Sequence, residues 1–184
     1  KRVAGKFYFD DSYFLSSKSV ETDHDQTVAY NPGIGPLSLN FNRLRLIWDR
    51  DRKTGDLDAR IFAKTDRTRV EIDYLKTGFA PDRRDARHGL VYEEKGNGGR
   101  WLLIRRVRRK GEIWLPVKRP GLMTAHVFRK YAKEEGITLP APERGGSPPD
   151  ARPLHTQKSA ELFRIAAKVN WFSNNMAAEM LGLG

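Results

Sequence analysis

The stretch Leu37-Ser38-Leu39-Asn40-Phe41-Asn42-Arg43-Leu44-Arg45-Leu46-Ile47-Trp48 alternates apolar and polar side chains along most of its length. This alternation is typical of a β-strand that buries one of its two faces. The apolar positions change phase at Arg43, which predicts either a β-bulge near Asn42 or two separate strands. The centre of the chain therefore favours β-structure.

Other strand-like segments lie on both sides of this stretch. They are Phe7–Phe9, Tyr13–Leu15, Ala59–Ala63, Val70–Tyr74, Leu90–Tyr92, Trp101–Val107 and Glu112–Val117. The last two are expected to form a hairpin around Arg109-Lys110-Gly111, because a glycine-containing turn separates them. This number and spacing of strands predicts an antiparallel sheet, a sandwich or an open barrel.

Helical patterns occur only towards the C-terminus. Thr124 is expected to cap a helix that ends at Gly136, because apolar side chains recur there at helical spacing. Residues 140–153 hold five prolines and two glycines, which predict an extended linker. Two further helices are expected, from Gln157 to Val169 with Phe163 buried, and from Ser173 as N-cap onward.

These patterns together predict an α+β fold. Its parts are a basic β-rich domain with one packing helix at residues 1–139, a Pro/Gly-rich linker at 140–153 and a helical tail at 154–184. The β-rich domain is expected to be antiparallel, and the tail to be a helical hairpin.

Positive charge is concentrated in one part of the chain. Lys and Arg number 34 against 23 Asp and Glu, which gives a net charge of +11. Residues 41–120 alone carry a net charge of +10. A localised excess of this kind attracts phosphate backbones, so the composition predicts a nucleic-acid partner, either DNA or RNA.

Other compositional features exclude several classes of protein. The chain has no cysteine, so it has no disulfide, no thiolate metal site and no cysteine nucleophile. No apolar run approaches the roughly 20 residues that a membrane span needs. The N-terminal residues lack the apolar core of a signal peptide, so we expect a cytoplasmic protein without a membrane partner.

The densest basic segment is the first candidate site. Guanidinium groups bind phosphate oxygens bidentately, and an exposed indole ring can stack on an unpaired base. The predicted nucleic-acid-binding residues are Arg100, Arg105, Arg106, Arg108, Arg109, Lys110, Trp114, Lys118 and Arg119.

An acidic cluster is the second candidate. Glu21, Asp23 and Asp25 would line one face of an extended strand, and carboxylate oxygens in that arrangement can bind Mg²⁺ or Mn²⁺. His88, in an arginine-rich loop, is a candidate general base. No second group of ligands is evident, so the sequence predicts no metal site and no cofactor and assigns no catalytic residue.

The last 25 residues resemble the first two helices of a Fis-type helix-turn-helix. Asn174 to Gly184 carries the paired alanines Ala177-Ala178 and the Leu181-Gly182 turn of that pattern, and Phe163 to Ala167 would be the packing helix. The recognition helix is absent from the matching stretch. The resemblance implies DNA binding, and residues 1–155 suggest no particular family.

The sequence therefore favours a non-enzymatic nucleic-acid-binding protein, such as a DNA-binding regulator or a DNA-handling protein of a phage or plasmid. A metal-dependent nuclease or RNase toxin using the acidic cluster or His88 is the first alternative. A structural subunit is the second, with the C-terminal helices contacting a protein partner or a second copy of the chain.

Overall fold

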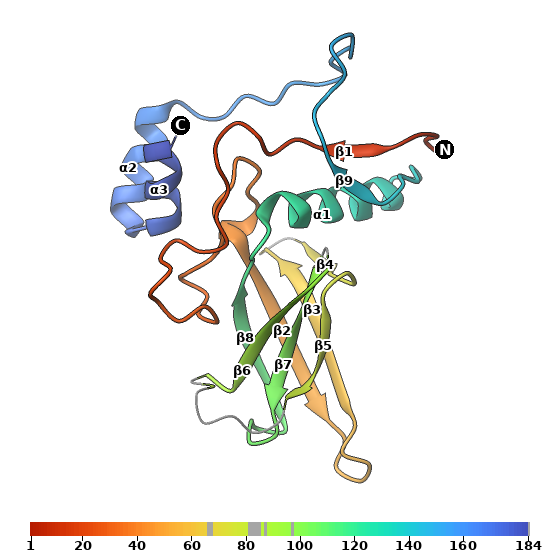
Figure 1. Cartoon of the computed structure of the whole chain (residues 1–184), viewed down its shortest axis with the longest axis vertical. Helices are drawn as coiled ribbons and strands as arrows, with labels where there is room; N and C mark the ends of the chain where they lie inside the picture. The colour runs from red at the N-terminus through yellow and green to blue at the C-terminus, as the bar shows by residue number, and fades with distance from the viewer. Residues whose placement is uncertain (66–67, 81–85, 87, 97, 184) are drawn as a thin grey trace.

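Two β-sheets form the body of the protein, as the computed structural model of residues 1–65, 68–80, 86, 88–96 and 98–183 shows (Figure 1). One sheet has the order β4 (Arg69–Glu71), β3 (Leu57–Lys64), β2 (Arg43–Arg50) and β8 (Lys110–Pro116), with antiparallel neighbours. The other has the order β5 (Lys76–Ala80), β7 (Gly98–Ile104) and β6 (Leu90–Lys95). The predicted α+β class, rich in antiparallel strands, is confirmed.

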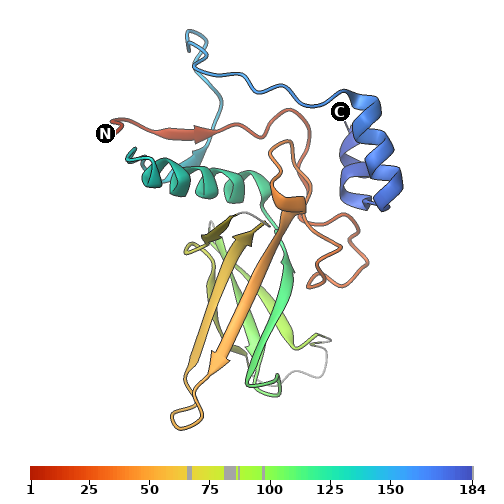
Figure 2. The same ribbon diagram turned by 180° about the vertical axis from the view of Figure 1, so that it is seen from behind.

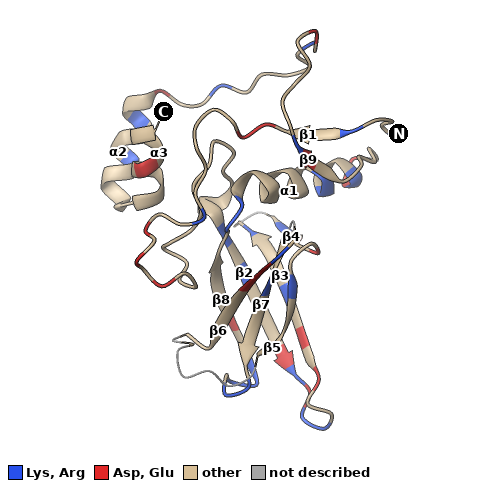
Figure 3. Ribbon diagram, viewed as in Figure 1, with Lys and Arg blue, Asp and Glu red and all other residues tan. Residues whose placement is uncertain are grey.

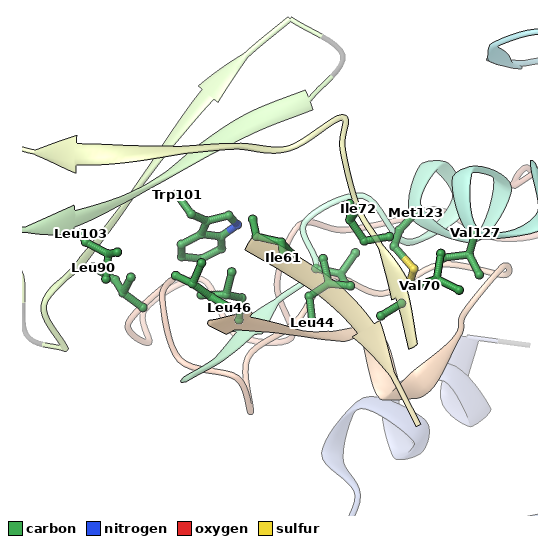
Figure 4. Packing of buried hydrophobic residues seen from close by; sticks show 13 residues of the cluster. Leu44, Leu46, Ile61, Val70, Ile72, Leu90, Trp101, Leu103, Met123 and Val127 are labelled. Atoms are coloured by element: carbon green, nitrogen blue, oxygen red, sulfur yellow. The ribbon is translucent and has the colours of Figure 1, made fainter. Parts of the chain in front are cut away.

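The hydrophobic core lies between these sheets. Leu46 of β2 and Ile61 of β3 meet Trp101 and Leu103 of β7 in one buried cluster (Figure 4). Met123, from the helix that covers one end of the sheets, belongs to the same cluster. Each large apolar side chain buried in this way contributes about 1.5–3 kcal/mol.

The start of β2 explains the phase change at Arg43. Asn40, Phe41 and Asn42 form a single 3₁₀ turn with φ near +50° at each residue. Asparagine tolerates this left-handed conformation better than most residues. The expected strand over residues 37–42 is therefore wrong, and β2 begins only after the turn.

Helix α1 (Pro120–Glu134) begins earlier than the sequence predicts. Pro120 occupies its first turn, where a missing N–H costs nothing. Thr124 therefore lies inside the helix, and the predicted cap at this residue is wrong. Gly136, with φ of +77°, follows the end of the helix as predicted.

A small parallel sheet lies beside α1. β1 (Phe7–Phe9) pairs with β9 (Pro142–Arg144), and Arg144 Nε donates to Asp11 Oδ1 at 2.5 Å. Part of the expected linker is thus a strand that ties the N-terminal segment to residues after α1. The division at residues 139 and 153 stays a prediction.

The C-terminal helices α2 (Leu162–Phe172) and α3 (Asn175–Leu183) form a hairpin beyond an extended segment (Figures 1 and 2). Val169 and Met176 are buried in it. Phe163, predicted to be buried, is 68% exposed. Within the described part of the chain, no helix has the length and apolar character to cross a membrane.

The predicted hairpin between residues 101–107 and 112–117 does not exist. β7 pairs with β5 and β6, whereas β8 pairs with β2 in the other sheet. Residues 105–109 therefore connect two sheets. Side-chain alternation along a few residues predicts that a segment is a strand. Which strands pair depends on how the whole chain is connected in the domain.

Candidate functional site

The predicted basic surface is interrupted by acidic side chains from other strands. Arg109 and Lys110 both pair with Asp49 of β2, at 2.8 and 2.6 Å. Lys and Arg residues are spread over the domain, with Asp and Glu among them (Figure 3). In the part of the chain that the structure describes, some of the positive charge of the basic segment is therefore paired with carboxylates.

Two more arginines of this set pair with β6. Arg100 binds Glu93 at 2.5 Å, and Arg119 binds Glu94 at 2.5 Å. Hydrogen bonds from Lys18 and Arg119 hold the pKa of the Glu94 carboxyl below its usual value. These carboxylates stand outside the basic segment in the sequence, so counting charges within the segment missed them.

The remaining members of the set have different surroundings. Arg105 lies over the ring of Phe79, and Trp114 lies under Arg45 at 4.7 Å. Lys118 is buried, and the Arg108 carbonyl accepts a hydrogen bond from Trp48 Nε1. Arg106 lies in the same connection between the two sheets. A binding role for these residues stays a prediction from sequence.

The acidic cluster is a loop and not the expected strand. Asp25 Oδ1 accepts hydrogen bonds from the backbone N–H and hydroxyl of Thr27, and Asn31 Oδ1 accepts one from the Glu21 N–H. His88 Nε2 lies 3.9 Å from Asp25 Oδ2. In the described ranges, no three His, Asp or Glu side chains are grouped so that they could hold a metal ion.

The turn between α2 and α3 has a distinct geometry. Ser173 ends α2 in the left-handed conformation, with φ of +48° and ψ of 49°. Its N–H donates to the Asn170 carbonyl at 3.3 Å, and the Asn174 N–H donates to the Val169 carbonyl at 3.1 Å. These bonds close the C-terminus of α2 and fix the path of the turn.

Ser173, Asn174 and Asn175 in this turn have different roles. Asn174 Oδ1 accepts a hydrogen bond from the Ala177 N–H at 3.1 Å, so Asn174 is the N-cap of α3. The predicted cap at Ser173 is therefore wrong by one residue. Ser173 and Asn175 are exposed, and their side chains make no hydrogen bond within the described part of the chain. The outer two residues are thus available to a ligand, and the middle one is structural.

The sequence of this turn resembles one motif of a class of active-site serine enzymes. Penicillin-binding proteins and class A β-lactamases combine Ser-x-x-Lys, Ser-Asp-Asn and Lys-Thr-Gly. Ser173-Asn174-Asn175 matches the second motif, with asparagine in the middle position. Asp and Asn are both strong N-cap residues, so the cap that Asn174 provides explains why either fits there.

Comparison with known families agrees with this class. The family model of D-Ala-D-Ala carboxypeptidase 3 (S13) matches residues 1–183, and the chain belongs to that family. A search of curated protein sequences finds no significant match.

The family overturns the functional predictions made from sequence. The Fis-type resemblance is wrong, because the family match includes the helical hairpin and extends over the whole β-rich domain. Paired alanines and a Leu-Gly pair occur in many packed helix pairs, so they did not distinguish the two families. Nucleic acid as the partner, the non-enzymatic function and the nuclease alternative are wrong for the same reason. A cytoplasmic location stays a prediction.

Two Lys-Thr-Gly tripeptides occur in the chain, and both serve the β-sheets. In Lys53-Thr54-Gly55 the N–H groups of Lys53 and Thr54 donate to Asp51 Oδ1 in the turn between β2 and β3. In Lys76-Thr77-Gly78 the Thr77 hydroxyl donates to the Ala59 carbonyl of β3 at 3.0 Å. Neither lies beside the turn between α2 and α3 (Figure 1), so neither is assigned to a site with Ser173.

Sequence reasoning missed the Ser173 turn. The sequence indicated Ser173 and Asn174 only as polar residues that precede a helix. The signal was present as Ser-x-Asn, but a pattern with two specified residues occurs often by chance. The position of Ser-x-Asn at a helix junction, with both outer side chains exposed, supports its assignment as a functional motif.

Proposed function

We propose that this chain is part of a serine-type D-Ala-D-Ala carboxypeptidase and supplies its Ser-x-Asn element through Ser173 and Asn175. The observation that carries this is the Ser173 turn, in a chain that belongs to the family. The substrate is then a peptide ending in D-Ala-D-Ala, and the reaction releases the terminal D-Ala. Such peptides belong to peptidoglycan, which replaces nucleic acid as the partner.

The two exposed side chains suit this chemistry. A serine hydroxyl donates one hydrogen bond and accepts others, so Ser173 can relay a proton near the scissile bond. The Asn175 amide offers two donors and an acceptor to a peptide backbone. These 184 residues contain no Ser-x-x-Lys, so no nucleophile is assigned among them.

The surface around the turn supports a larger catalytic unit. Trp171 and Phe172, directly before Ser173, are 83% and 73% exposed, and Leu162 and Phe163 are exposed on the same helix. Large apolar side chains exposed in this number on one short helix are expected where another protein segment covers part of it. We propose that the segment carrying the nucleophile packs against α2 here.

The test is release of D-Ala from an N-acetylated peptide ending in D-Ala-D-Ala, using the purified natural protein. Ser173→Ala and Asn175→Ala should each lower kcat/KM by roughly 10²-fold or more, as expected when a proton relay or a substrate contact is lost. The matched control is Ser159→Ala, since Ser159 is an exposed serine outside the helices. Full activity in both motif variants would refute the assignment.

A further inference from the structure

A cavity of about 450 Å³ lies where the N-terminal segment meets the start of α1 and strand β9, and no described residue of α2 or α3 lines it. Phe9, Leu15 and Leu122 form apolar parts of its wall. Sites for small organic ligands have volumes of roughly 300–1,000 Å³. The cavity is thus large enough for a short peptide and much larger than an inorganic anion needs.

The wall of the cavity carries excess positive charge. Its cations are Lys18, Lys118, Arg119 and Arg144, and its carboxylates are Asp11 and Glu143. The ion-pair partners outside the wall are Lys6 and Glu94, and the carboxylates of Asp10 and Asp25 also interact electrostatically with Arg144 and Lys118. The excess therefore belongs to the wall itself, with four cations against two carboxylates, and an anion in the cavity would contact it.

Lys118 is the least compensated of these cations. The side chain is buried, and its ammonium donates to Gln26 Oε1 at 3.1 Å, an amide oxygen without charge. The Gln26 amide nitrogen donates to backbone carbonyls of the loop, which orients this oxygen. Burial lowers the pKa of Lys118 to about 8, against a smaller opposing effect of Asp25. A buried ammonium without a carboxylate contact gains from a nearby anion.

Two further groups in the wall retain donors. The Ser16 hydroxyl is buried and has no hydrogen-bond partner within the described residues. An unpaired buried hydroxyl costs about 1–3 kcal/mol, and rotation about its Cα–Cβ bond can turn it towards a ligand. Arg144 contacts Asp11 through Nε, which leaves its terminal nitrogens for another acceptor.

We propose that this cavity binds a short peptide through its carboxylate, at a second site separate from the Ser173 turn. Lys118 and Arg144 face the carboxylate, and Phe9, Leu15 and Leu122 contact the small apolar side chains. The choice of a peptide ending in D-Ala rests on the proposed function, whereas the preference for an organic anion rests on the cavity itself.

The test is calorimetric titration of the natural protein carrying Ser173→Ala, in which turnover is suppressed. The probe is N-acetyl-D-Ala-D-Ala, compared with its C-terminal amide and with inorganic phosphate. We expect the amide to bind at least tenfold more weakly than the acid. Lys118→Met and Arg144→Gln should each weaken binding of the acid at least fivefold. Lys133→Met, at the exposed far end of α1, is the matched control and should not change it.

Each alternative result overturns the proposal. Equal binding of acid and amide removes the role of the carboxylate. Binding of phosphate without the peptide identifies a site for inorganic anions only. The proposed active site can also bind this peptide, and neither Lys118 nor Arg144 is placed there, so only a binding event that these substitutions weaken is assigned to the cavity. If neither Lys118→Met nor Arg144→Gln weakens any binding event, or if no peptide binds, the cavity does not bind this peptide. Loss of activity in Ser173→Ala and Asn175→Ala tests the proposed function separately.

Discussion

The Asn174 side chain caps helix α3 by accepting a hydrogen bond at Oδ1 from the backbone N–H of Ala177, at 3.1 Å. This bond fixes the start of α3 directly beside Ser173, which closes α2 in the left-handed conformation. One short turn therefore both ends a helix and begins the next, with the flanking Ser173 and Asn175 side chains exposed.

Replacing Asn174 should separate the structural role of the turn from its chemical one. Asn174→Ala removes the cap and should expose the Ala177 amide to faster hydrogen exchange, at a cost of about 1 kcal/mol to local stability. Asn174→Asp should keep both the cap and the activity. Hydrogen exchange with mass spectrometry measures this, with Asn170→Ala on the exposed face of α2 as the control. Equal exchange in the Ala and Asp variants would contradict it.

Lys118 predicts a defined pH dependence of stability. Its pKa is about 8 in the folded protein and near 10.5 when exposed. Below pH 8 both states carry the charge, and the folded state bears the full cost of burying it. Between these values the unfolded state binds more protons, so stability rises with pH.

The substitution Lys118→Met should remove this dependence. The variant should be more stable than the natural protein by about 1–3 kcal/mol at pH 7, and the difference should shrink from pH 8 to pH 10. Urea unfolding at several pH values measures it, and Lys133→Met is the control. A difference that is constant over this range would show that Lys118 titrates normally.

Asn42 should be among the most sensitive positions in the β-rich domain. It is fully buried, and its Nδ2 donates to the Gly33 carbonyl at 2.8 Å. Asn42→Ala leaves that carbonyl unpaired and should cost about 2–4 kcal/mol in unfolding free energy. Asn40→Ala shares the left-handed backbone but is not buried, so it should cost clearly less. If urea unfolding gives similar losses of unfolding free energy for the two variants, the effect comes from the backbone conformation and not from the buried side chain.

Gly111 on β8 should not tolerate a side chain. A Cβ atom at this position would collide with the indole ring of Trp48, which its hydrogen bond to the Arg108 carbonyl holds in place. Gly111→Ala should therefore lower stability by about 1–3 kcal/mol. Gly182→Ala in α3 meets no neighbouring atom and should be neutral or slightly stabilising. Thermal unfolding of both variants measures this. An unchanged midpoint for Gly111→Ala would contradict the predicted collision with Trp48.

The sequence predicted the local structure at the Ser173 turn but not its function. The polar residues before the last helix were identified as a helix start, because capping is a property of neighbouring residues. Their role in a peptidase was not predicted, because the basic segment at residues 100–119 indicated a nucleic-acid partner. That segment was misleading because its counterions, Asp49, Glu93 and Glu94, come from other strands.

The sequence by itself determined the α+β class, the strand pattern around Trp48 and the end of α1 at Gly136. Each of these depends on side-chain alternation or on the backbone preference of one residue, which act over a few positions. Only the tertiary structure decided that β7 and β8 lie in different sheets, that β9 pairs with β1, and that Lys118 is buried beside a cavity. These features join residues far apart in the chain, so they follow from how the whole domain buries its core and not from any local pattern.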